Sequence, residues 1–195
     1  MEPRRLLEIL AVADRLKDTT RHCYTAGGRH ESVAEHCWRA ALMAYFLREE
    51  FPEADMDKVI KMLLIHDLGE AFTGDIPSFR KTKENEQTED ALLEEWVATL
   101  PQPYAGEMRA LYAEMAARET AEAKIYKAID NFEAVIQHNE SPLSTWIPEE
   151  YELNRTYGWD KAAFSPYLTR LRQQMLEDTE KKIAEGTNGE PLPEY

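Results

Sequence analysis

A histidine and two carboxylates come directly after an apolar segment of the chain. Residues 57–65 are rich in leucine, isoleucine, methionine and valine, and His66, Asp67 and Glu70 follow them. A carboxylate in buried surroundings normally has a charge partner or binds a metal ion. On a continuous helix Glu70 lies one turn beyond His66 on the same face, and Asp67 is close enough to reach a common centre. The spacing predicts a metal site here.

Two further candidate ligands lie on other predicted helices. His36 follows Ser-Val-Ala-Glu at residues 32–35, which has the pattern of a capping box at a helix start. Asp130 lies among apolar residues of a long predicted helix, residues 120–139. Two imidazoles and two carboxylates suit one divalent ion such as Mn, Co, Fe or Mg, with Zn also possible. An ion with an open position can serve hydrolysis, because it makes a bound water acidic.

Each candidate also has an ordinary structural interpretation. A His-Asp pair at a helix end is often a cap or a surface pair, and His36 alone fits a satisfied histidine near the surface. Asp130 can equally form a structural ion pair with Lys127 or Arg21. The joint pattern favours the metal site over these separate explanations.

Length, composition and charge indicate a soluble globular protein. The 195 residues fit one domain, and 43% of them are hydrophobic while 31% are charged. The balance of 23 basic against 37 acidic residues gives a net charge of −14, which argues against binding to nucleic acid or to an anionic membrane. The longest apolar stretch, residues 40–47, is too short to span a bilayer. Cys23 and Cys37 form no paired motif, which favours a reducing cytoplasm.

Helical periodicity dominates the chain, so the predicted fold class is all-α, in a single helical domain. No alternating strand pattern is found. The domain is predicted to cover residues 1–185, and residues 186–195, with two glycines and two prolines, to form a flexible tail. The predicted helices cover residues 6–16, 32–50, 57–70, 85–100, 105–117, 120–139, 148–154 and 166–184.

The motifs, taken in order, resemble the HD superfamily of metal-dependent phosphohydrolases. The combination is similar to the bacterial and eukaryotic 5'-deoxynucleotidases of that superfamily, over residues 21–137. The matching elements are Arg21, Glu-Ser-Val-Ala-Glu-His at 31–36, His-Asp-Leu-Gly-Glu at 66–70, Thr-Gly-Asp-Ile-Pro at 73–77 and Lys-Ala-Ile-Asp at 127–130.

The resemblance implies an all-helical HD domain with one divalent metal ion, which hydrolyses deoxynucleoside 5'-monophosphates to nucleoside and phosphate. It also suggests a homodimer. By position, the implied metal ligands are His36, His66, Asp67 and Asp130. Glu70 matches the essential glutamate beside the phosphate, and its proton transfer would either activate the water or protonate the 5'-oxygen. The implied substrate contacts are Arg21 to the phosphate, Asp75 to the sugar, and Ile76, Pro77 and Ser78 along the pocket wall.

One position departs from the family pattern. The best-studied bacterial members carry a tryptophan after the pocket arginine, which helps to reject the ribose 2'-hydroxyl. This chain has His22 there. A histidine is smaller and can donate or accept a hydrogen bond, so it need not exclude that hydroxyl. Preference for deoxyribose over ribose is therefore not implied.

Two other functions fit parts of the pattern. One is an HD-type hydrolase of another phosphoester, either a phosphodiester or a guanosine polyphosphate. The cyclic-dinucleotide branch typically has lysine where Glu70 stands, which disfavours that branch. The other is a catalytically silent metal-binding scaffold or sensor, and the complete ligand set together with Glu70 and Arg21 argues against it. The basic residues Arg80, Lys81 and Lys83 are interpreted first as solvent-exposed charge, and only second as an anion-attracting group.

Overall fold

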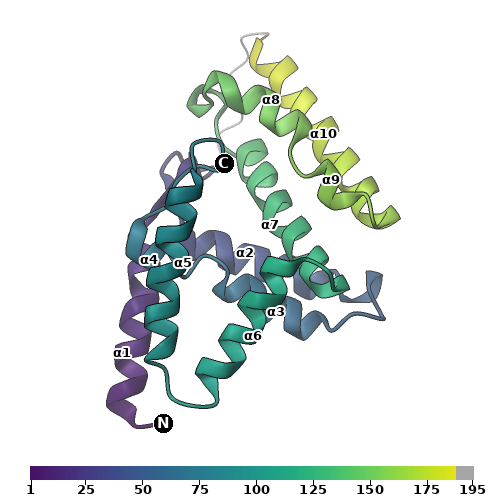
Figure 1. Cartoon of the computed structure of the whole chain (residues 1–195). Helices are drawn as coiled ribbons and strands as arrows, with labels where there is room; N and C mark the ends of the chain where they lie inside the picture. The colour runs from purple at the N-terminus through teal and green to yellow at the C-terminus, as the bar shows by residue number, and fades with distance from the viewer. Residues whose placement is uncertain (188–195) are drawn as a thin grey trace. The chain divides into compact units, whose positions relative to one another are not determined.

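A computed structural model describes residues 1–187, and nearly all of its regular elements are helices, as predicted (Figure 1). No helix in this range is both long enough and apolar enough to cross a membrane. The first half contains α1 (Pro3–Asp14), η1 (Arg15–Lys17), α2 (Val33–Phe46), η2 (Arg48–Glu50), α3 (Met56–Ile65), α4 (Glu70–Thr73) and α5 (Lys83–Ala98). The second half contains α6 (Tyr104–Ala117), α7 (Ala121–Glu140), η3 (Leu143–Thr145), α8 (Pro148–Thr156), α9 (Trp159–Ala162) and α10 (Pro166–Thr187).

The structure adds one feature that the sequence did not predict, a two-stranded sheet. Strands β1 (Thr20–Tyr24) and β2 (His30–Ser32) are hydrogen-bonded neighbours. They are only five and three residues long and mostly polar, so they carry no alternating pattern. In the connecting loop Gly28 has φ +78°, a conformation that favours glycine, and this glycine lets the chain turn back.

The predicted helix over residues 57–70 is wrong at its end. The helix α3 stops at Ile65, and Glu70 begins a separate short helix, α4. The backbone N–H of Leu68 donates to the Ile65 carbonyl at 3.1 Å, which tightens the chain into a turn. A β-carbon on Gly69 would lie 2.6 Å from Cγ of Glu89, so α5 packs directly on this turn. His66 and Glu70 therefore do not share one helical face.

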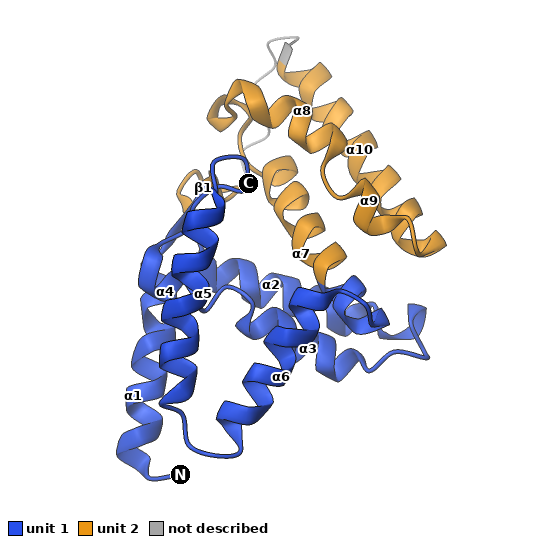
Figure 2. Cartoon of the chain, viewed as in Figure 1, with its two compact units in different colours: residues 1–22, 31–126 blue, residues 23–30, 127–195 orange. Residues whose placement is uncertain are grey.

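The chain divides into two compact units (Figure 2). The first comprises residues 1–22 and 31–126, and the second comprises residues 23–30 and the chain from residue 127 onward. The boundary passes through β1, β2 and α7. A core cluster of the first unit is formed by Leu16, Val33, Cys37, Leu68, Leu93, Val97, Leu100 and Ala105. This core fixes α2, α5 and the turn before α4 against one another.

The predicted capping box at the start of α2 is confirmed. The Ser32 hydroxyl accepts a hydrogen bond from the Glu35 backbone N–H at 3.3 Å, and the Glu35 carboxylate accepts one from the Ser32 backbone N–H at 2.9 Å. Both groups would otherwise be unpaired at a helix N-terminus. The box therefore fixes the first turn of α2, which carries His36.

In the second unit α10 packs on α8 and α9. The predicted N-cap is present, since the Ser165 hydroxyl accepts from the Leu168 backbone N–H at 3.3 Å. Arg172 is fully buried and donates to the carbonyls of Asn154 and Tyr157, at 2.6 and 2.8 Å, which closes the end of α8. Burial lowers the pKa of Arg172 to about 10. From residue 188 on, the predicted tail lies outside the described residues.

Candidate active site

Three of the predicted ligands converge within the first unit. His36 is fully buried in the first turn of α2, and His66 and Asp67 lie in the turn after α3. The His36 Nε2 and His66 Nε2 atoms are 3.2 Å apart. Asp67 Oδ2 lies 3.2 Å from His66 Nε2 and 3.7 Å from His36 Nε2. Two helices thus bring two nitrogens and one carboxylate oxygen to a common point.

The spacing of these three atoms fits a divalent ion. Two ligands at about 2.1 Å from a metal, with an angle between 90° and 109°, are about 3.0–3.4 Å apart. The 3.2 Å separations match that range, and the 3.7 Å separation lies slightly beyond it. Three donors from the protein leave further positions for a fourth ligand, water or substrate.

The orientation of His66 is set by its second ring nitrogen. Nδ1 lies 2.8 Å from the Leu63 carbonyl, which can only accept, so Nδ1 carries the proton. The lone pair of Nε2 is then available for a metal ion shared with His36 and Asp67. The hydroxyl of Tyr112, on α6, donates to the Ile65 carbonyl at 2.7 Å and holds the backbone just before His66. These two hydrogen bonds fix the orientation of the His66 imidazole that metal binding requires.

Arg21 lies at the edge of this cluster on β1. Its Nε is 3.1 Å from Glu31 Oε2, and its Nη1 is 3.9 Å from Asp67 Oδ2. The buried Glu31 carboxylate therefore fixes the guanidinium beside the candidate ligands. Sequence reasoning included Glu31 in a motif but gave it no role, and its place next to Arg21 in space is set by the pairing of β1 with β2.

Glu70 is a buried carboxylate with an unusual environment. Its side chain is 5% exposed, and within residues 1–187 its buried Oε2 has no hydrogen-bond partner. Burial, followed by the negative charges of Asp67 and Asp75, raises the pKa of Glu70 to about 10, although Arg21 opposes the shift. A carboxyl group that holds a proton beside the candidate metal ligands can take part in proton transfer.

The predicted substrate-contacting loop follows α4. Gly74 has φ +78°, and its backbone N–H donates to the Glu70 carbonyl at 2.8 Å, so the loop starts directly from the glutamate. Burial raises the pKa of Asp75 above its usual value, although Arg21, His22 and Lys81 oppose this shift. Ile76 and Pro77 are half-buried, and Ser78 is exposed.

His22 lies on β1 in the first unit, with its ring edge-to-face with Phe79 at 5.4 Å between centroids. Phe79 comes two residues after Pro77, so the same loop that carries Asp75 also contacts His22. The predicted residues of the sugar-side pocket are therefore neighbours in the first unit.

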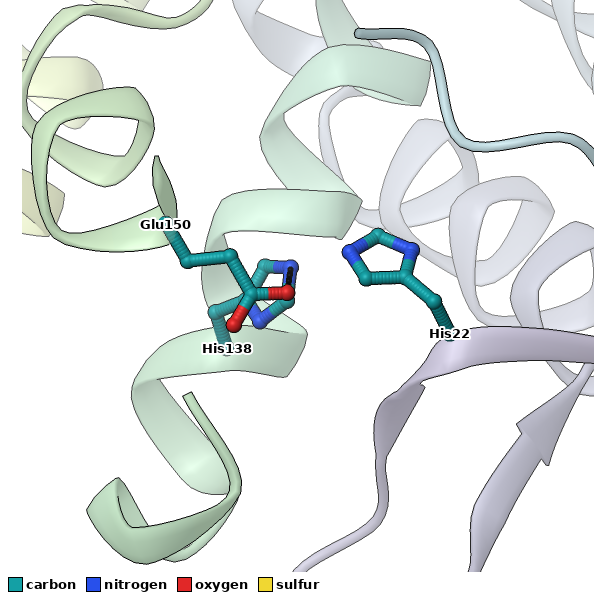
Figure 3. A group of neighbouring side chains, drawn as sticks. All are labelled: His22, His138 and Glu150. Carbon is teal, nitrogen blue, oxygen red and sulfur yellow. Dashed lines mark ion pairs between the residues drawn. The ribbon is translucent and has the colours of Figure 1, made fainter. Parts of the chain in front are cut away.

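Asp130 lies on the part of α7 that belongs to the second unit, where its Oδ2 accepts from the Lys127 ammonium at 2.6 Å. The second unit also pairs His138 of α7 with Glu150 of α8, at 3.7 Å (dashed in Figure 3). The His138 carbonyl accepts from the indole N–H of Trp146 at 3.0 Å, which fixes the segment between them. This pair was not predicted, because His138 has no partner at ligand spacing in the sequence.

Known proteins of similar sequence and structure show the family to which this chain belongs. The HD domain family profile matches residues 13–172. The 5'-deoxynucleotidase HDDC2 of Xenopus laevis is 30% identical over 186 residues, which cover 92% of this chain and 90% of that relative. The protein of the same name from Homo sapiens is 30% identical over 141 residues, 70% of this chain and 68% of the relative. A solved structure, the predicted metal-dependent phosphohydrolase from Magnetospirillum magnetotacticum MS-1, is 28% identical and superimposes with a TM-score of 0.73 over 91% of this chain and 96% of that one. By this match, and as its motifs predict, the chain belongs to the HD domain family of phosphohydrolases.

Proposed function

We propose that this protein is a metal-dependent 5'-nucleotidase that hydrolyses nucleoside and deoxynucleoside 5'-monophosphates to nucleoside and phosphate. The observation that carries the proposal is the convergence of His36, His66 and Asp67 beside Arg21. The relatives named 5'-deoxynucleotidase support the choice of substrate.

We assign one divalent ion, Mn, Co, Fe, Mg or Zn, to His36, His66 and Asp67, with Asp130 as the fourth ligand. When bound, such an ion acts as a Lewis acid toward a phosphate oxygen and makes a water molecule more acidic. Asp130→Asn should then reduce the metal content of the purified protein, whereas Asp160→Asn, an exposed residue of α9, should not. Equal metal content in both variants would remove Asp130 from the ligand set.

The remaining residues act on the substrate itself. The planar guanidinium of Arg21 can grip two phosphate oxygens in a fork, which an ammonium cannot match. Glu70 transfers a proton, either from the attacking water or to the 5'-oxygen of the leaving nucleoside. Asp75 contacts the sugar, and Ile76, Pro77 and Ser78 line the pocket beside it.

Phosphate release from dAMP and AMP tests the proposal. The protein is stripped of metal, and Mn, Co, Mg, Fe or Zn is added back. Metal-dependent release from dAMP is the expected result. If metal is bound and neither nucleotide is cleaved, the protein acts on another phosphoester or is a silent scaffold.

We infer that His22 leaves the pocket open to ribose. The wild-type protein should cleave AMP and dAMP with similar efficiency, because an imidazole can hydrogen-bond the 2'-hydroxyl rather than exclude it. His22→Trp should increase the preference for dAMP by about tenfold or more, since the larger ring fills that space. The ratio of kcat/KM for the two nucleotides is the measurement. Strong discrimination by the wild type would contradict the inference.

We also infer a homodimer in the cytoplasm. Helix α2 carries large apolar side chains at helical spacing that are exposed in the structure, with Trp38 at 62% and Phe46 at 73% exposure, together with Leu42 and Tyr45. Such a stripe on one helix face is typical of a surface that packs against another molecule. Cys23 and Cys37 form no disulfide bond in the described part of the chain, which fits a reducing compartment.

A further inference from the structure

A partly buried ion pair joins Lys81, at the end of the loop that carries Asp75, to Glu89 of α5. Lys81 Nζ is 2.7 Å from Glu89 Oε2, and the two side chains are only 21% and 13% exposed. The pair thus differs from another ion pair of α5, Glu94 with Arg109, whose side chains are 57% and 44% exposed at a similar distance. A partly buried pair is less screened by solvent, so losing one partner matters more than at the surface.

Lys81 is tied to the loop through the backbone. Its N–H donates to the Pro77 carbonyl at 3.0 Å, and the N–H of Arg80 donates to the same carbonyl at 2.7 Å. This turn fixes Lys81 relative to Pro77, which is two residues beyond Asp75. At its other end the loop is held by the bond from the Gly74 N–H to the Glu70 carbonyl.

Glu89 also packs against the turn that precedes Glu70. Its Cγ lies 2.6 Å from where a β-carbon of residue 69 would be, so only glycine leaves room for it. Gly69 directly precedes Glu70. One ion pair therefore connects the segment that carries Asp75 to the turn that carries Glu70, and both to α5.

We propose that Lys81 and Glu89 form a positioning pair that holds residues 74–81 against α5 and the Gly69 turn, and so sets how tightly the nucleoside part of the substrate is bound. The inference rests on the proposed nucleotidase function. It assigns to Lys81 an indirect role through Asp75, and no contact with the phosphate.

The test compares two substrates, dAMP and p-nitrophenyl phosphate, which is a phosphate monoester without a sugar. Lys81→Met and Glu89→Gln should each raise KM for dAMP by about tenfold, the effect expected for losing a charged hydrogen bond. KM for p-nitrophenyl phosphate should change far less. Because the two residues act as one unit, the double variant should lose no more than the worse single variant. Lys81→Arg should restore most of the loss.

Arg109→Met is the matched control, since it breaks the exposed ion pair that joins Glu94 of α5 to Arg109 of α6. It should leave both KM values unchanged. If Lys81→Met impairs both substrates equally and Glu89→Gln impairs neither, Lys81 acts on the phosphate and the positioning role is wrong. If both variants behave like the control, the pair has no role at the site.

Hydrogen–deuterium exchange separates this inference from the proposed function, because it needs no activity. Backbone amides of residues 74–81 should exchange faster in Lys81→Met and Glu89→Gln than in the wild type or in Arg109→Met. Unchanged exchange in an active enzyme overturns the pair's role alone. Faster exchange in a protein that never cleaves dAMP keeps the structural role of the pair but overturns the nucleotidase proposal.

Discussion

Glu70 combines burial, neighbouring negative charge and a polar atom with no hydrogen-bond partner among residues 1–187. Such a group lowers the stability of the fold, and costly groups of this kind concentrate at active sites, where function maintains them. Its neighbours Asp67 and Asp75 belong to the candidate metal and sugar sites. At the scale of single residues, substitution of Glu70 therefore tests the proposed chemistry of the site most directly.

Replacing Glu70 by alanine should abolish proton transfer without removing the metal. General acid–base catalysis typically contributes about 10²–10⁴-fold, and we expect kcat for dAMP to fall by that order. Metal content, measured on the same sample, should stay at the wild-type level. A variant that loses its metal together with its activity would show that Glu70 is a ligand.

Glu70 should also make the stability of the metal-free protein depend on pH. Its pKa is raised to about 10 in the folded state, so the folded protein binds this proton more tightly than the unfolded chain does. The contribution of Glu70 to stability is therefore full at low pH and declines as pH rises from about 4.3 toward 10. Glu70→Gln mimics the protonated carboxyl group and cannot ionise. The stability of this variant should therefore lack the decline that Glu70 causes as pH rises.

Thermal melting at pH 5 and pH 8 tests this. The metal-free Glu70→Gln variant should melt above the metal-free wild type, and the difference should be larger at pH 8. An advantage of 1 kcal/mol corresponds to about 2–4 °C for a chain of this size. If the difference in melting temperature is equal at the two pH values, or larger at pH 5, the assigned direction of the pKa shift of Glu70 is wrong.

At the scale of elements, the site depends on where its helices begin. His36 projects from the first turn of α2, immediately after the Ser32 capping box. A second capping box, formed by Thr82 and Asn85, starts α5, which carries no candidate ligand. The Ser32 and Thr82 caps are therefore comparable, but only Ser32 starts a helix that carries a candidate metal ligand.

Ser32→Ala and Thr82→Ala should cost similar stability but differ in metal binding. Loss of an N-cap hydroxyl typically costs about 1 kcal/mol, so both variants should melt a few degrees lower. Only Ser32→Ala should weaken the affinity for the metal, because only α2 carries a ligand in its first turn. The measurements are thermal melting and metal titration. Equal metal affinities in the two variants would show that the α2 cap does not position His36.

At the scale of the whole molecule, the exposed stripe on α2 should decide the oligomeric state. Phe46→Glu places a charge in the proposed interface, where it would have to be desolvated. We expect this variant to sediment as a monomer while the wild type sediments as a dimer. Leu10→Glu changes another exposed apolar residue, which lies on α1, and this variant should stay dimeric. If Leu10→Glu dissociates and Phe46→Glu does not, the interface lies on α1.

The sequence by itself determined the fold class, most of the helices and the order of the motifs. Three local signals predict the helices correctly: apolar residues at helical spacing, the capping box at Ser32 and Glu35, and the N-cap at Ser165. They succeed because each acts within one or two helical turns. The His-Asp pair and its flanking motifs likewise identified the HD domain family before any contact was known.

Only the tertiary structure decided the features that depend on contacts distant in the chain. The end of α3 at Ile65 and the restart at Glu70 follow the packing of Glu89 against Gly69, twenty residues apart in sequence. The short strands around Arg21 and Glu31 exist because they pair with each other, which no local pattern reveals. Lys81 appeared as surface charge in the sequence, and its burial against α5 makes it a partner of Glu89 instead. Side-chain charges can be counted along a sequence, but their partners, and hence their pKa values and roles, are set by the fold.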